Sequence, residues 1–203
     1  AVEFLEEFRL RGLIRKYSDH VSFPIRLKIA GKEGDEAGDE AEQVNRAKAL
    51  WTRPRNEIDE DEYVEFYRHV THDFSDPLTH SHNKVEGKRE YTSLLYVPSV
   101  APMDLWNREA PRGVKLYVQR VFITDEAAEF LPLYLRFIRG VVDSNDLSLN
   151  VSREMLQDDV VIRRIRKNLV TRVLKELSEL KERTPETFLS IYEQFPSVLN
   201  ENE

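Results

Sequence analysis

Residues 114–123 read VKLYVQRVFI, and this stretch decides the fold class. It is rich in β-branched and aromatic residues and follows Gly113, a combination that is typical of a β-strand. Residues 91–97 have the same character, and residues 133–142 read as a further strand or a buried extended run. The sequence therefore predicts a sheet that is built from several short strands.

Helical patterns lie on both sides of these strands along the chain. Apolar residues recur every three or four positions over 4–17, and Asp59 with Glu62 forms a capping-box pattern at the start of a short helix. The same apolar spacing over 161–180 predicts a long amphipathic helix, and a last helix follows it and runs to Pro196.

This order of elements predicts an α/β protein. We expect a three-layer α-β-α sandwich with a mixed sheet over 1–158, followed by a small C-terminal helical segment over 159–203. Residues 31–42 contain three glycines and six acidic residues but no large apolar side chain, so we expect a mobile loop over 31–45.

The composition excludes several classes of site. The 203 residues carry a net charge of −7 and include no cysteine, which excludes a disulfide framework, a thiolate metal site and a cysteine nucleophile and favours the cytoplasm. The glycine-rich motifs that cradle phosphates are absent, so we do not expect the chain to hold a nucleotide by itself. No stretch approaches the ~18 apolar residues of a membrane span, so we expect no membrane segment.

Two charged or polar clusters leave alternatives open. Four histidines lie close together in the sequence, namely His69, His72, His80 and His82, but a loop that contains Pro77 separates the two pairs, and we predict no metal site. Residues 160–175 include six basic residues and no acidic one, which suits either a helix with a charged outer face or, as the alternative function, a nucleic-acid-binding module.

A further unusual feature is the position of Arg153. Asn150 or Ser152 can cap a helix there, which places Arg153 in the first turn, where the helix dipole disfavours a cation. Arg153 can serve as a clamp on a phosphate that is held elsewhere, or Glu154 can simply neutralise it; from the residues alone the two interpretations are equal.

A series of motifs resembles, in order, the middle domain of the 90-kDa heat-shock protein family of ATP-dependent chaperones. The motifs are LWTR (50–53), EYVEFY (62–67), DPL (76–78), VEG (85–87), LYVQRVFI (116–123), YLRFIRGVVDS (134–144) and LNVSRE (149–154). The resemblance covers nearly the whole chain except the acidic loop. The run HDFSDPL (72–78) and the pair Leu105-Trp106 are more similar to the bacterial form of the family.

The resemblance implies a set of roles for this chain. Arg153 matches the family arginine that reaches the γ-phosphate of ATP, Gln157 matches its polar companion, and Asn150 and Ser152 shape the loop that presents both. The exposed client-binding positions of the family correspond to Phe74, Met103 and Trp106.

The resemblance also implies the partners. ATP and Mg²⁺ are held mainly by an N-terminal domain, a C-terminal domain forms a homodimer, and unfolded client proteins bind. From the resemblance we also expect that the second, smaller α/β subdomain of the family's middle domain is absent from this chain. By itself it is expected to be a monomer that neither binds nor hydrolyses ATP, with no nucleic-acid or membrane partner.

Overall fold

The computed structural model describes residues 6–28, 41–87, 90–103, 105–106, 113–125, 129–149 and 160–199. Its contacts divide the chain into two units, which are described separately. The first unit comprises residues 1–49 with 119–122, and the second comprises 50–118 with 123–203.

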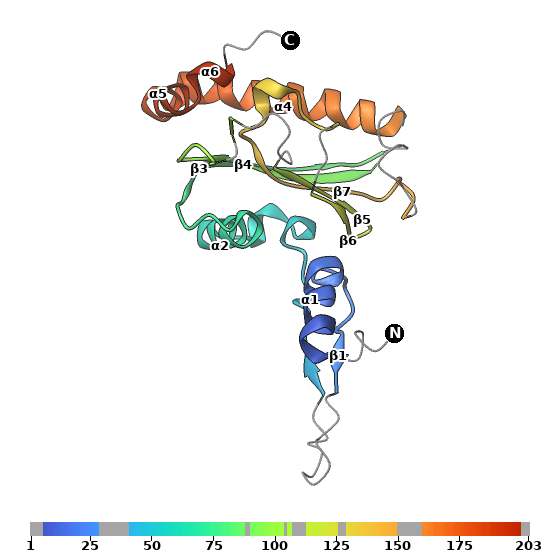
Figure 1. Cartoon of the computed structure of the whole chain (residues 1–203). Coiled ribbons are helices and arrows are strands. Elements are labelled where there is room, and N and C mark those ends of the chain that lie inside the picture. The colour runs from blue at the N-terminus through green and yellow to red at the C-terminus, as the bar shows by residue number, and fades with distance from the viewer. Residues whose placement is uncertain are drawn as a thin grey trace. The chain divides into compact units, whose positions relative to one another are not determined.

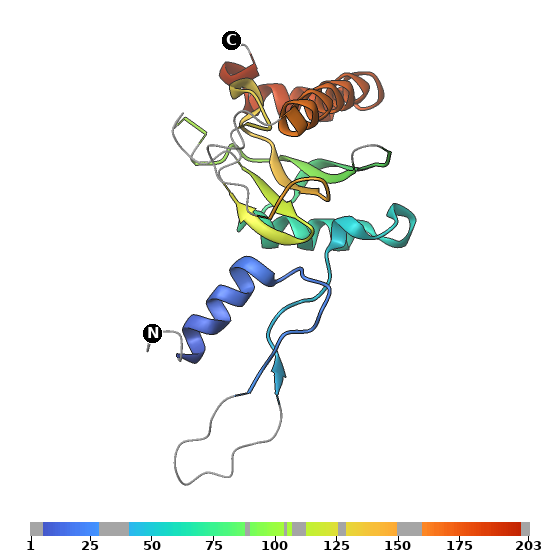
Figure 2. The same ribbon diagram turned by 90° about the vertical axis from the view of Figure 1, so that its right-hand side faces the viewer.

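In the described part of the first unit, a helix is followed by a short two-stranded ribbon (Figure 2). The helix is α1 (Glu7–Ser18), and β1 (Arg26–Leu27) pairs antiparallel with β2 (Glu42–Gln43). The part of the predicted loop that the structure describes, 41–45, therefore contains a strand. Arg11 on α1 forms ion pairs of 2.6 Å with Glu7 and with Glu42 of β2.

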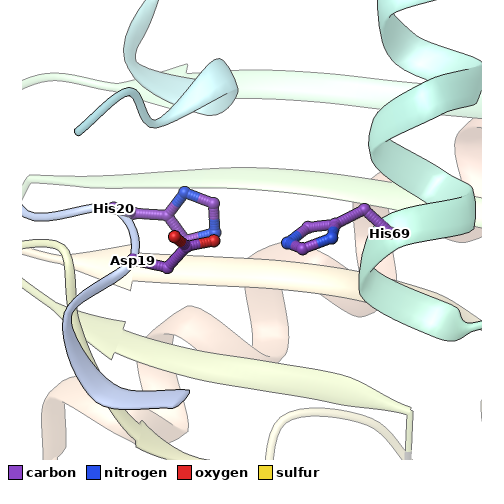
Figure 3. A group of neighbouring side chains, drawn as sticks. All are labelled: Asp19, His20 and His69. Carbon is purple, nitrogen blue, oxygen red and sulfur yellow. The ribbon is translucent and has the colours of Figure 1, made fainter. Parts of the chain in front are cut away.

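The predicted helix over 4–17 matches α1, but its apolar side chains are not buried. No residue of α1 is buried, and Phe8 is 90% exposed. The turn after α1 is well fixed, because Asp19 accepts a hydrogen bond from the Arg46 N–H (3.0 Å) and His20 Nδ1 lies 2.9 Å from the carbonyl oxygen of Lys48. Figure 3 labels Asp19 and His20, which belong to this unit, and also His69, which belongs to the second unit.

The second unit is built on a mixed five-stranded sheet of order β3-β4-β7-β5-β6. The strands are β3 (Pro77–Val85), β4 (Tyr91–Pro98), β5 (Val114–Val118), β6 (Val121–Thr124) and β7 (Arg139–Ser144). β4 pairs antiparallel with β3 and with β7, whereas β5 pairs parallel with β7. This sheet confirms the predicted α/β class.

Helices cover both faces of the sheet, as Figure 1 shows. On one face lies α2 (Glu60–Thr71), and on the other lie α4 (Val160–Arg183), α5 (Pro185–Gln194) and α6 (Pro196–Leu199). The capping box at Asp59 and Glu62 is present as predicted. The buried face of α4 packs into the same core as the sheet through Ile162, Ile165, Leu169, Val173 and Leu177. Burial of each such side chain contributes about 1.5–3 kcal/mol relative to exposure.

Three details of the strands differ from the prediction. The single strand predicted over 114–123 is two strands, because Gln119 and Arg120 both adopt positive φ (50° and 69°) and form a tight turn. Such turns usually contain glycine or asparagine, and this one contains neither. The run 133–142 divides into a 3₁₀ turn at Leu133–Leu135 and β7. The loop expected at Pro77 is the start of strand β3, on which His80 and His82 pack against Tyr63 of α2.

Candidate functional site

The four residues predicted to act at the nucleotide, Asn150, Ser152, Arg153 and Gln157, lie outside the described residues. The predicted client-binding residues are described, and all three are exposed. Phe74 is 87% exposed, Trp106 is 62% exposed and Met103 is fully exposed.

Phe74 lies on a turn between α2 and β3 that hydrogen bonds hold on both sides. His72 ends α2 in the left-handed conformation, and the Tyr67 hydroxyl donates to the Asp73 carboxylate (2.6 Å). The N–H and the hydroxyl of Ser75 both donate to Asp73, at 2.9 and 2.6 Å. The residues on either side of Phe74 are therefore fixed while its ring projects into solvent.

The electrostatics of this turn depend on Asp73. Burial by itself would raise the pKa of its carboxyl, but the hydrogen bonds from Ser75 and Tyr67 outweigh it and lower the pKa of Asp73. Burial, with the hydrogen bond to Asp73, raises the pKa of Tyr67. Asp73 is thus a carboxylate and Tyr67 a neutral donor at neutral pH, so the turn that carries Phe74 keeps its hydrogen bonds.

Met103 and Trp106 lie in the connection that follows β4, and this segment is also anchored. The Leu105 side chain between them is buried in the core, and its N–H donates to the carbonyl of Pro102 (3.0 Å). The buried guanidinium of Arg136 donates from Nε to the Leu105 carbonyl at 2.8 Å. Because Leu105 points inward and is held there, its neighbours Met103 and Trp106 remain outside.

The sheet brings the two anchored segments to one end. Pro77 at the start of β3 pairs with Pro98 at the end of β4. The turn that carries Phe74 enters β3 at this end, and the segment that carries Met103 and Trp106 leaves β4 from the same end. We call these three side chains the apolar cluster.

Sequence reasoning missed a buried polar network that fixes the start of the second unit. His82 on β3 is buried, and its Nε2 donates to the carbonyl oxygen of Trp51 (2.9 Å). Its Nδ1 therefore accepts from the Tyr63 hydroxyl (2.8 Å), which requires a neutral ring. The Trp51 indole N–H donates in turn to Asp143 of β7 (2.8 Å). This network could have been predicted only from the register of β3, which places the His82 side chain inward.

Both histidines of β3 resist protonation. Burial lowers the pKa of His82, although its hydrogen bond to Trp51 opposes the shift. Burial also lowers the pKa of His80, which stacks on the Tyr63 ring at 4.0 Å and lies 3.3 Å from Glu60. His82 is buried and His80 is half-buried, and both rings act as packing and hydrogen-bonding groups against α2.

We expect stability to fall with acidification because of His82. Its folded-state pKa is below its unfolded value of about 6.5, so the unfolded chain binds more protons as the pH falls below that value. The free energy of unfolding should therefore decrease between pH 7 and 5 because of this group. Urea unfolding of the chain at several pH values measures it.

The control for this prediction is His72→Asn, because His72 is exposed and asparagine tolerates its left-handed backbone. His82→Gln should flatten the dependence of unfolding on pH, whereas His72→Asn should leave it as in the unaltered chain. Equal slopes in the two variants would contradict the assignment to His82.

The basic stretch that the sequence singled out lies on α4. Its apolar residues face the core, and in its second half the charges pair along the helix, with Arg172–Glu176 at 2.6 Å and Arg183–Glu179 at 2.9 Å. This is the charged outer face of a core helix. Within the described residues, no helix is sufficiently long and apolar to cross a membrane.

Comparisons with known proteins agree with the resemblance of the motifs. The family described as Hsp90 protein matches residues 28–201. The chaperone protein HtpG of Salmonella paratyphi B and that of Salmonella typhi are each 55% identical to this chain over 199 residues. The match covers 98% of the chain and 32% of each relative, so the chain spans about a third of the length of these relatives.

A solved structure gives the same assignment. The middle domain of a heat shock protein from Plasmodium falciparum superimposes with a TM-score of 0.65 at 29% identity, over 74% of this chain and 58% of that one. The chain therefore belongs to the Hsp90 family. Within the family it corresponds to the middle domain, and it is similar to that of the bacterial chaperone HtpG. None of these matches supports the nucleic-acid alternative.

Proposed function

We propose that this chain is the part of an ATP-dependent molecular chaperone that binds unfolded proteins through the apolar cluster. The observation that carries this proposal is the exposure of Phe74, Met103 and Trp106 on anchored turns at one end of the sheet. When a partner covers large apolar side chains that are exposed to water, the binding free energy becomes more favourable by about 25 cal/mol for each Å² of apolar surface that is buried.

The chemistry of the cluster suits partners of varied sequence. Methionine is unbranched and polarizable, and aromatic rings supply large contact areas with few rotatable bonds. Because the hydrogen bonds of Asp73 and Arg136 already fix the backbone, binding orders little of this chain. A cluster of this kind favours exposed apolar segments of an unfolded protein over a folded surface.

Substitution of the cluster is expected to weaken binding without unfolding the chain. Phe74→Ser, Met103→Ser and Trp106→Ser combined should lower the affinity for reduced, carboxymethylated lactalbumin about tenfold or more, measured by fluorescence anisotropy. Each side chain is exposed, so the melting temperature should change little. Phe8→Ser is the matched control, since Phe8 is equally exposed but lies on α1. Unchanged affinity in the triple variant with an intact fold would reject the proposal.

The second part of the proposal concerns ATP. We infer that Arg153 contacts the γ-phosphate of ATP held, with Mg²⁺, by an N-terminal domain of the same protein. Gln157 assists it, and Asn150 and Ser152 shape the loop. Membership of the Hsp90 family and the unusual cation at the start of a helical run support this role. A guanidinium is permanently charged and offers planar, bidentate hydrogen bonding, which suits a terminal phosphate.

Family membership also supports a proposal about the assembly. We propose a cytoplasmic homodimer in which a C-terminal domain dimerises and the present chain lies between it and the ATP-binding domain. We further propose that residues 1–158 form the layered subdomain and 159–203 the helical segment, with the second small α/β subdomain beyond them. The chain alone should remain a monomer without measurable ATP hydrolysis.

A further inference from the structure

The outer edge of β3 offers a second kind of contact beside the apolar cluster. β3 is an edge strand of the five-stranded sheet, and in the part of the chain that the structure describes no strand pairs with its outer side. Of its nine residues only His82 is buried, whereas in β4 every residue except Thr92 is buried. The outer side of β3 is therefore an edge of about 30 Å to which no strand of the described chain pairs.

Pro77 and Lys84 stand at the two ends of this edge, but the stretch between them lacks the usual features that prevent strand addition. Residues 78–83 read LTHSHN, which contains no proline and no charged residue, since burial keeps both histidines neutral. The pairing with β4 is regular from Thr79 to Val85, and its single irregularity lies between Pro77 and Thr79. Lys84 follows the open stretch and is engaged with Glu86 at 2.5 Å.

The opposite edge of the same sheet is different. β6 has only four residues, Val121–Thr124, and a short edge strand offers few backbone groups to a partner. Proteins commonly blunt exposed edges, so the stretch 78–83, which has no proline and no charged residue, indicates a surface that receives an extended segment.

The apolar cluster continues this edge. Phe74 precedes Pro77 by three residues, and the segment with Met103 and Trp106 leaves β4 where β4 pairs with the start of β3. A strand that pairs along β3 therefore runs toward the end of the sheet where these apolar side chains project. Backbone hydrogen bonds supply affinity without regard to sequence, and the cluster selects apolar side chains.

We propose that β3 binds an extended segment of an unfolded polypeptide as an additional strand, with the apolar cluster holding the aromatic end of that segment. This inference rests on the proposed function, because it gives the mode in which the same unfolded partner binds. The segment that binds must have one backbone edge without hydrogen-bond partners, contain no proline and be apolar at one end. A folded protein does not offer such a segment.

Three peptides test the proposal on the complete 203-residue chain. The parent peptide has ten residues that alternate threonine and valine, with phenylalanine at both ends and a fluorescent label. Two variants of this peptide, the twins, carry backbone N-methyl groups, one on every valine nitrogen and the other on every threonine nitrogen. Each twin has the same side chains as the parent, but one of its two backbone edges cannot donate N–H hydrogen bonds. We expect at least one twin to bind tenfold or more weakly than the parent. If both twins bind within twofold of the parent, or if the parent does not bind at 1 mM, backbone pairing is wrong.

Hydrogen exchange measured by mass spectrometry locates the contact. Saturation with the parent peptide should slow exchange in residues 78–83 tenfold or more and leave 121–124 on β6 unchanged as an internal control. If Phe74→Ser weakens peptide binding but the peptide does not protect β3 from exchange, the edge proposal is wrong. The proposal that the apolar cluster binds unfolded proteins is then still supported. Protection of β3 with full affinity in the triple serine variant would support the edge and reject the apolar cluster as the client surface.

Discussion

Replacement of Arg153 by alanine is expected to reduce ATP turnover about 100-fold or more when this chain is combined with the N-terminal ATP-binding domain of its family. The reason is electrostatic, because a guanidinium next to the γ-phosphate stabilises charge that develops during transfer and also holds the closed arrangement of the two parts. ATP binding should be unaffected, since the proposed pocket belongs to the other domain. Steady-state turnover and a separate ATP-binding isotherm measure the two quantities.

Arg163→Ala provides the matched control. Arg163 is an exposed arginine on α4, so its loss changes the net charge by the same amount at a position outside the predicted nucleotide residues. Turnover in this variant should stay within about twofold of the unaltered chain. Equal turnover in the Arg153 and Arg163 variants would refute the proposed role of Arg153, and hydrolysis by this chain alone would show that the pocket is not where we propose.

The largest effect on stability is expected at Gly140 in the centre of the sheet. Its φ is +136°, which side-chain-bearing residues rarely adopt, and a Cβ there would lie 2.1 Å from the carbonyl oxygen of Leu94 on β4. Neither strand can move away without losing its hydrogen bonds to the other. Gly140→Ala should therefore lower the free energy of unfolding by about 4 kcal/mol or more, a large share of the ~5–15 kcal/mol typical of a domain. Urea unfolding followed by circular dichroism measures the loss.

Gly12→Ala makes the same chemical change where the structure has room. Gly12 lies in α1, and a Cβ built on it has no heavy atom within 4 Å. Alanine stabilises helix interiors by about 1 kcal/mol relative to glycine, so α1 should become more stable and the sheet unit should unfold as before. A loss below 1 kcal/mol in Gly140→Ala would mean that β4 and β7 are not packed as closely as the structure has them.

Local patterns predicted the elements whose causes are local. The side chains of Asp59 and Glu62 satisfy backbone groups only three residues apart, so the start of α2 can be read directly from the sequence. The period of apolar residues in α4 likewise reflects a single helix face. The turn at Gln119 and Arg120 was missed because its positive φ values come from the twist of the paired strands rather than from a glycine.

The candidate site was predictable in part, for the same reason. The motifs pointed to Phe74, Met103 and Trp106, but nothing local indicated that they would be exposed or that Asp73 and Arg136 would hold their turns. Exposure depends on what packs nearby from elsewhere in the chain. In α1 the periodicity of apolar residues is clear and would predict a buried face. Phe8 on this helix is nevertheless exposed.

Periodicity, capping and motif order are properties of neighbouring residues, so the α/β class, the principal helices and membership of the Hsp90 family could be predicted from the amino-acid sequence. That His82 is a buried neutral ring and that β3 is an open edge became known only from the packed structure. Both depend on partners far away in the chain, as the bond from Trp51 to Asp143 illustrates across 92 residues. Burial, pairing and exposure result from packing, and packing is settled only when distant segments meet.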